Sequence, residues 1–201
     1  ILLSFLSTAI CLILAYPLAM ILSQKQVNQT SFIVLIFILP MWMNFLLRTF
    51  AWMTILENNG LINKFLGLFG IGPLHMINTQ GAVILGMVYN YIPFMILPIY
   101  TTMCKIGNDV IEAAQDLGGN TFQVMARVVI PLSLPGVSTG ITMVFVPSLT
   151  TFVISDLLGG SKILLIGNVI EQEFTRGSNW NQGSGLSLVL MIFILISLLP
   201  T

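Results

Sequence analysis

Charge is what this chain of 201 residues has least of, since seven basic and seven acidic residues make up only 7% of it. Soluble globular domains carry charge on about a quarter of their residues, so the composition excludes an ordinary soluble domain. The two signs also balance, which leaves no basic surface for a nucleic acid. The chain is instead 56% hydrophobic with a mean hydropathy of +0.99, values that indicate an integral membrane protein.

Residues and motifs for catalysis are also missing. The one histidine, His75, has no cluster of metal ligands around it in the sequence, so no metal site is predicted. The phosphate-binding motif G-x-x-x-x-G-K-[ST] is absent, and the segment 159–162 has its glycines, serine and lysine in the wrong order to replace it. Two cysteines cannot build a disulfide framework. We therefore expect no enzyme activity and no cofactor on this chain.

Long stretches without charge predict the membrane spans. Residues 1–24, 26–47 and 128–155 contain no charged residue, and 74–104 contains only His75. Each stretch holds the ~20 residues that a spanning helix needs. The predicted fold is an all-α polytopic transmembrane bundle, one domain over 1–201 with about five to six spans, both ends of which look trimmed. The spans are expected at 1–22, 31–54, 81–104, 131–155 and 185–201.

Basic residues in the connecting loops do not decide the orientation of this bundle. An excess of Lys and Arg usually marks the cytoplasmic loops. Here three lie on each side: Lys25, Lys105 and Arg127 against Lys64, Lys162 and Arg176.

The polar connection 105–130 predicts a helix, a turn and a second helix. Asp109 with Glu112 three residues later is an acidic version of the capping box, so the first helix is expected to start at Asp109. Gly118 can supply the left-handed turn that ends it. Asn120 with Gln123 forms a second capping pair.

The second helix of this connection is expected to run to Ile130. Pro131 then opens the next span, because proline is tolerated in the first turn of a helix. A polar hairpin that merely links two spans is the plainer interpretation of this segment.

A rarer combination of residues points beyond a plain linker. Glu112 is followed by two alanines, by Gly118 and, ten residues after this glycine, by a run from Val128 to Pro131. The combination, placed between two spans, resembles the EAA loop of binding-protein-dependent ABC importer permeases. In that family the pattern ends in Ile-x-Leu-Pro, and Val128 and Ile130 depart from it conservatively.

The resemblance implies a type I importer permease in which 105–130 is cytoplasmic and its first helix docks on an ATP-hydrolysing subunit. Glu112 and Asp116 form a like-charge pair at i and i+4 that a basic partner surface would relieve. The residues assigned to this contact are Asp109, Glu112, Ala113, Ala114, Asp116 and Gly118.

The resemblance also implies partners and a location. These are a homologous second permease subunit, two ATP-binding subunits that hold the ATP and Mg, and an extracytoplasmic solute-binding protein. The chain would lie in the lipid bilayer of the bacterial cytoplasmic (inner) membrane as a multi-pass subunit, with 55–80 and 156–184 facing outward.

Three further stretches of the sequence narrow the range of possible solutes. Residues 152–162, the run Asn44–Phe50 and the Tyr-x-x-x-Pro-Phe run from Tyr89 to Phe94 look like segments of spermidine/putrescine importer permeases. This implies ATP-driven import of polyamines by alternating access. Permeases for another small solute, such as iron or an oxyanion, share the scaffold and stay open as alternatives. An ion-coupled secondary transporter would normally carry ionisable residues deep in its spans, whereas Arg48 and Asp156 lie near span ends.

A polyamine needs carboxylates, carbonyls and aromatic faces along its path. Asp156 is expected to close the fourth span, with Phe152 on the same helical face. Asp156 could equally serve only as a cap for the helix end. Pro93 and Pro98 are expected to break the third span and free backbone carbonyls. The candidate path residues are Asp156, Phe152, Tyr89, Asn90, Trp42 and Asn44.

Three remaining features have structural explanations. Arg48 is expected to extend to the outer interface. The stretch 61–69 has amphipathic helical spacing and is expected along that interface. Gly136 and Gly140 form a small-residue face suited to close helix packing, within this chain or against a partner.

Overall fold

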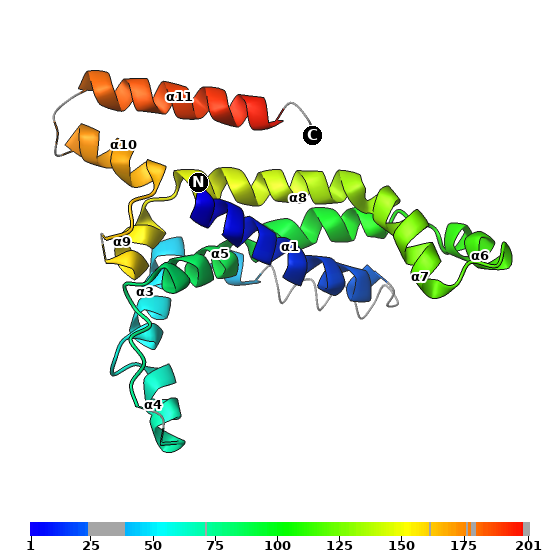
Figure 1. Ribbon diagram of the computed structural model, residues 1–201, viewed down its shortest axis with the longest axis horizontal. Helices are drawn as coiled ribbons and strands as arrows, with labels where there is room; N and C mark the ends of the chain where they lie inside the picture. Colours follow the sequence, from blue (N-terminus) through cyan, green and yellow to red (C-terminus); the bar gives the residue numbers. More distant parts are fainter. Residues whose placement is uncertain (24–38, 71, 161, 176, 178–179, 199–201) are drawn as a thin grey trace.

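The computed structural model describes residues 1–23, 39–70, 72–160, 162–175, 177 and 180–198. Over these residues the chain forms helices and no strand. Helices α1 (Leu2–Ser23), α5 (Gln80–Met103) and α8 (Ile130–Thr150) pack side by side as a bundle (Figure 1). Each belongs to a helix long and apolar enough to cross a membrane. The predicted all-α membrane bundle is therefore confirmed, with its first and third spans where expected.

A face of small residues on α1 lets the three helices approach closely. Ser4 Oγ donates a hydrogen bond to the Ser148 carbonyl of α8 at 2.9 Å, and Cys11 Sγ lies 3.8 Å from the Val88 carbonyl of α5. Lipid tails are as apolar as the helices, so helix association in a bilayer depends on such close packing and hydrogen bonding. The members of this face are fully buried: Ser4, Ser7, Cys11, Ala15 and Ala19.

The packing of α8 against α5 uses Gly136 and Gly140, as the small-residue spacing predicted, and both contacts lie within this chain. A Cβ added at Gly136 would stand 2.7 Å from the Pro98 carbonyl oxygen. One added at Gly140 would stand 2.7 Å from Met95 Sδ and 3.3 Å from the Met95 carbonyl oxygen. The two distances of 2.7 Å are shorter than real Cβ contacts, so glycine sets the separation of these helices.

The prolines of the third span do not break it, contrary to the prediction. α5 continues through Pro93 and Pro98 from Gln80 to Met103. The Pro98 carbonyl accepts from the Thr102 hydroxyl at 2.8 Å. Threonine hydroxyls and neighbouring helices can replace the hydrogen bonds that a proline removes inside a membrane helix.

The fourth span ends earlier than predicted. α8 stops at Thr150, Thr151 is extended, and α9 (Val153–Gly159) is a separate short helix. Asp156 therefore lies in the first turn of α9 and does not close the span.

The described part of the second expected span is interrupted, and its residues 31–38 lie outside the described residues. A 3-10 turn, η1 (Leu39–Trp42), precedes α3 (Phe45–Leu56), and α4 (Leu61–Leu68) follows. Figure 1 shows α3 and α4 extending sideways from one end of the bundle, across the direction of α5 and α8.

The last two helices lie at the side of the bundle. α10 (Ile166–Thr175) leads to α11 (Trp180–Leu198), which contains the described part of the last expected span. Its apolar part, Trp180–Ile196, is shorter than the three long helices. α11 packs mainly on α10 (Figure 1), and much of its apolar surface is exposed.

Gly136→Ala should destabilise the bundle. The added methyl group would press on the Pro98 carbonyl, which is held in a helix backbone, and such overpacking costs about 1–3 kcal/mol. We expect a lower thermal unfolding midpoint for the detergent-solubilised protein. In the control Gly81→Ala the nearest atom to the new Cβ would be Thr79 Oγ1 at 3.8 Å, an ordinary contact. Equal midpoints for the two variants would contradict this account of the α5–α8 contact.

Candidate functional site

The polar loop forms a helix pair at the end of the bundle opposite α3 and α4 (Figure 1). α6 (Asn108–Asp116) begins after Gly107, whose backbone is extended and supplies no side-chain cap. The predicted capping box at Asp109 is therefore wrong, because Asp109 already lies in the first turn of α6. Its carboxylate still favours the helix, since negative charge is stabilised near a helix N-terminus.

The two glycines after α6 make the tight turn that the sequence predicted. Gly118 has a φ of +85°, in the left-handed region that glycine adopts without steric cost. Its N–H donates to the Gln115 carbonyl at 2.8 Å, and the Gly119 N–H donates to the Ala114 carbonyl at 3.1 Å. A Cβ at Gly119 would stand only 2.6 Å from the Ala114 carbonyl oxygen, so the turn needs glycine at both positions.

The second predicted capping box is present. Asn120 accepts from the Gln123 backbone N–H at 2.8 Å, and Gln123 Oε1 accepts from the Asn120 N–H at 3.1 Å. These bonds start α7 (Thr121–Val124).

The second helix of the loop does not end where the span begins, contrary to the prediction. α7 continues through a π-helical segment, η2 (Met125–Val129), directly into α8, as one helix from Thr121 to Thr150. Within η2 the Ile130 N–H bonds to the Met125 carbonyl, five residues back. Pro131 lacks an N–H and cannot continue the ordinary ladder. The loop and span are thus one continuous element.

The surface of the helix pair carries two large apolar side chains that the sequence analysis missed. Leu117 is 90% exposed and Phe122 is 80% exposed, beside the exposed Glu112 and Asp116. The sequence did contain a signal for them, because Leu117 precedes the glycine turn and Phe122 follows the Asn120 cap in a mainly polar loop. Between the helices lies a pocket of about 250 Å³ whose lining includes Ala114, Leu117, Gly118 and Arg127. An apolar and acidic surface with a hollow is suited to docking another protein.

At the other end of the bundle, a buried asparagine organises the residues around Asp156. The side-chain Nδ2 of Asn168 donates to Asp156 Oδ1 at 2.9 Å and to the Phe152 carbonyl at 3.2 Å. Its Oδ1 accepts from Ser155 Oγ at 2.5 Å and from the Leu165 N–H at 3.0 Å. One oxygen of Asp156 is thus held in a structural network that joins α9 to α10.

Phe152 lies four residues before Asp156, at the N-terminus of α9. Phe152 is the N-cap residue of α9, and its carbonyl accepts from the Asp156 N–H at 3.0 Å. Its side chain lines a pocket of about 270 Å³ together with Thr150, Ile170 and Glu171. The acid that lines this pocket together with Phe152 is Glu171.

Tyr89 and Asn90 lie on α5 in different surroundings. The Tyr89 ring meets Trp52 of α3 edge to face, with centroids 5.1 Å apart. Asn90 is 2% exposed, and its Nδ2 donates to the Gly86 carbonyl at 2.8 Å. Asn90 Oδ1 has no hydrogen-bond partner among the described residues, so it is a free acceptor in the protein interior.

Trp42 and Asn44 are not brought to Asn90. Trp42 is exposed on η1, and Asn44 caps α3 by accepting from the Leu46 N–H at 2.9 Å. The cap accounts for Asn44 without a solute.

Arg48 does not extend to the interface, contrary to the prediction. It is 8% exposed on α3, and neither its Nε nor its Nη1 has a hydrogen-bond partner within the described part of the chain. Buried cations are normally paired, so this guanidinium is the least satisfied charged group that the structure describes.

The chain is similar to known transport proteins over nearly its whole length. Residues 2–200 match the family described as binding-protein-dependent transport system inner membrane component. The Haemophilus influenzae spermidine/putrescine transport system permease protein PotB is 41% identical over 193 residues, which cover 95% of this chain and 68% of that protein. The Escherichia coli PotB is 36% identical over 98% of this chain and 72% of that protein.

Among solved structures, a crystal structure of a bacterial ABC transporter involved in the import of the acidic polysaccharide alginate matches 98% of this chain and 76% of its own. The TM-score is 0.78 at 16% sequence identity. A second crystal structure, of the alginate transporter with a pentasaccharide-bound periplasmic protein, gives 0.77 over 98% of this chain and 75% of its own, also at 16% identity. At this identity the two structures show a common fold.

Asn168→Ala should destabilise the α9–α10 end of the bundle far more than Asp156→Asn. The first change leaves the buried Ser155 hydroxyl and Leu165 N–H without their acceptor, at about 1–3 kcal/mol for each unsatisfied group. In the second, the new amide oxygen can still accept from Asn168. Thermal unfolding of the purified protein should separate the two variants. A loss of stability as large in Asp156→Asn as in Asn168→Ala would overturn the structural role given to Asn168.

Proposed function

The chain belongs to the family of binding-protein-dependent transport system inner membrane components, and we propose that it couples ATP hydrolysis on partner subunits to solute import. The observation that carries the proposal is the helix pair α6–α7 at one end of the bundle. Its exposed residues include Glu112 and Ala113 of the EAA pattern, and its turn depends on Gly118. This pair is the surface on which an ATP-binding subunit would dock. The contact residues are those named from the sequence: Asp109, Glu112, Ala113, Ala114, Asp116 and Gly118.

The exposed Leu117 and Phe122 would add the apolar part of this contact. A few residues in well-packed, desolvated positions near the centre of an interface contribute most of its binding energy. The acidic pair Glu112 and Asp116 would meet a basic surface of the partner, which also relieves their mutual repulsion.

The continuous helix from Thr121 to Thr150 supplies a route for the coupling. A displacement of α6 acts on α7 through the Gly118–Gly119 turn, and α7 continues through η2 into α8. α8 packs closely on α5 at Gly136 and Gly140, so the displacement would shift both helices together. Rigid-body motion of this kind is how alternating access is commonly achieved.

The assembly we propose contains partners that supply what this sequence lacks. Two ATP-binding subunits would hold the ATP and Mg, a homologous second permease subunit would complete the path, and an extracytoplasmic solute-binding protein would deliver the solute. The described dependence of this family on a binding protein supports the last of these. An ion-coupled secondary transporter is not retained, because family membership argues against it.

We propose polyamines as the solute because both relatives are described as spermidine/putrescine permeases. Two groups could face an ammonium along the path. Asn90 Oδ1 is an acceptor inside the bundle with no partner among the described residues, and the Trp52–Tyr89 pair offers an aromatic face beside it in sequence. Asp156 would contribute at the outer end, where one of its carboxylate oxygens is not used by Asn168. Iron or an oxyanion remains the alternative solute.

Glu112→Lys and Gly118→Asp should uncouple transport while the chain still inserts in the membrane. Charge reversal would meet a basic partner surface with repulsion, and Asp at a φ of +85° strains the turn. We expect a loss of solute-stimulated ATPase activity and of uptake in the full complex. The control Glu57→Lys makes the same charge change at the other end of the bundle and should leave the amount of bound ATP-binding subunit unchanged. Normal coupling in both loop variants would refute the docking role.

Asp156→Asn tests the outer part of the polyamine path. The change keeps the acceptor for Asn168 and removes the charge. Spermidine uptake at subsaturating concentration should fall several-fold or more, because loss of one partly desolvated ion contact costs roughly 1–3 kcal/mol. Insertion and ATPase docking should not change. Uptake at the wild-type level would leave Asp156 with its structural role alone and move the search to Asn90 or to the partner subunit.

A further inference from the structure

The short helix α4 exposes an apolar stripe to the surroundings of the bundle. Leu61, Phe65, Leu68 and Phe69 are between 61% and 82% exposed. At 3.6 residues per turn these positions fall on one side of the helix. The Phe65 and Phe69 rings meet edge to face with centroids 5.2 Å apart, so these two members of the stripe form one apolar surface.

The opposite side of α4 is fixed to the rest of the chain. Asn63 is buried, and its Nδ2 donates to the Glu57 carbonyl at 3.1 Å and to the Leu74 carbonyl at 3.0 Å. Its Oδ1 accepts from the Leu74 N–H at 2.9 Å. Gly60 sets the angle between α3 and α4, because a Cβ there would stand 2.4 Å from the Ile55 carbonyl oxygen. The exposed stripe is therefore held in a defined direction.

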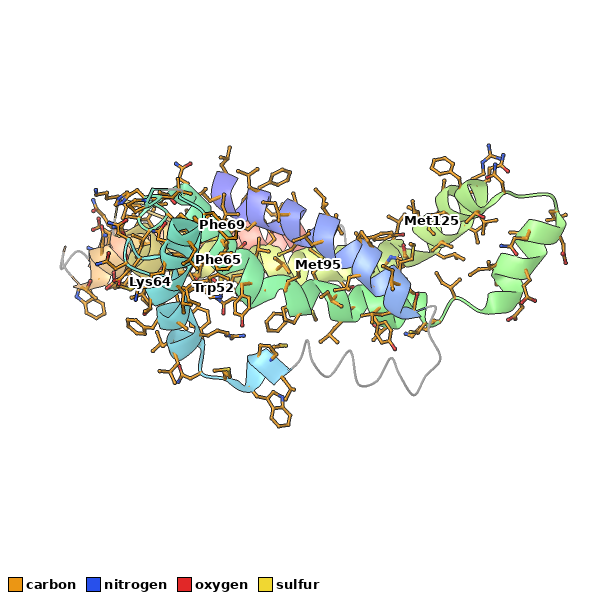
Figure 2. All side chains as sticks on the ribbon, turned by 90° about the horizontal axis from the view of Figure 1, so that it is seen from below. Trp52, Lys64, Phe65, Phe69, Met95 and Met125 are labelled. Atoms are coloured by element: carbon orange, nitrogen blue, oxygen red, sulfur yellow. The ribbon has the colours of Figure 1, made fainter. Side chains whose placement is uncertain are left out.

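That direction lies across the membrane helices. Figure 1 shows α4 extending sideways from the end of the bundle, across the run of α5 and α8. Figure 2 places Lys64, Phe65 and Phe69 at this end and Met125 at the other. A helix that lies across the spans, at the level where they end, runs along the membrane surface. Leu47 and Phe50 of the neighbouring α3 are exposed apolar residues as well.

We propose that α4 is an in-plane anchor whose apolar stripe lies in the boundary between phospholipid headgroups and acyl chains, at the end of the bundle opposite the α6–α7 loop. A helix with an apolar stripe, aromatic rings and a basic residue at its edge has the composition of interfacial helices. Lys64 is exposed beside the stripe, where its ammonium group can reach the headgroups. The bilayer already surrounds the spans at this level, so it covers the stripe without a further protein. The anchor would hold α3, with Trp52 and Arg48, at a constant depth. The proposal depends only on the membrane location of the chain, not on its solute or its ATPase contact.

Spin labels placed around α4 in the assembled complex test the proposal. Phe65→Cys, Phe69→Cys and, as the matched control on the same helix, Lys64→Cys would each be made with Cys104→Ser, because Cys104 is exposed whereas Cys11 is buried. The labelled complex is reconstituted in vesicles of phosphatidylcholine and phosphatidylglycerol. Collisions with oxygen, which partitions into the bilayer, are compared with collisions with a water-soluble nickel chelate. We expect oxygen to dominate at positions 65 and 69 and the chelate to dominate at position 64.

Other occupants of the stripe give different results. Equal and high access of the chelate to positions 64, 65 and 69 would mean that the stripe faces water, and the anchor would be refuted. Protection of positions 65 and 69 from both reagents would identify a protein contact with the second permease subunit instead. Immobilisation of these labels only after the solute-binding protein is added would make α4 a docking surface for that protein. Solute uptake is measured in the same vesicles. The lipid contact of α4 and the proposed import are then tested separately, because lipid contact at α4 can be present whether or not uptake occurs.

Discussion

Close approach of α1, α5 and α8 is the constraint on which the rest of the molecule depends. Inside a bilayer the hydrophobic effect does not draw helices together, so contact depends on packing and on hydrogen bonds between backbones that come near. The buried Ser, Cys and Ala face of α1 and the two glycines of α8 permit this approach. Once the three helices are fixed, the α6–α7 pair is held at one end and the α3–α4 arm at the other (Figure 1).

The two ends of the bundle differ in how they are joined to it. The α6–α7 pair is rigid in itself, through its glycine turn and capping box, and it continues into α8 without a break. A force on this loop therefore reaches a membrane helix directly. The other end is interrupted at Met43, Asn44 and Thr151, where helices stop and short helices start again.

At this interrupted end, the hydrogen bonds of the buried polar side chains distinguish residues with a structural role from candidates for a functional role. The Asn168 side chain makes four hydrogen bonds, one of them to Asp156. These bonds explain much of the arrangement around Asp156 without a solute. Arg48 and Asn90 are the contrast, since each has buried polar atoms without a partner among the residues described here. Unpaired buried groups are costly, and they are commonly kept where another molecule or another conformation satisfies them.

The sequence by itself determined the features that depend on neighbouring residues. Gaps between charges located the spans of α1 and α5, and the spacing of Asn120 and Gln123 and the position of Gly118 predicted a cap and a turn that the structure contains. The EAA pattern indicated the family. Only the tertiary structure decided that α5 runs through its prolines, that α8 ends at Thr150, that Gly107 and not Asp109 precedes α6, and that Arg48 is buried. Contacts between distant segments also lie outside any local pattern: Asp156 is held by Asn168, twelve residues away, and Ser4 bonds to Ser148, 144 residues away. A local sequence pattern contains both partners of a cap or a turn, so it can predict them. It does not contain the distant partners that the fold brings together.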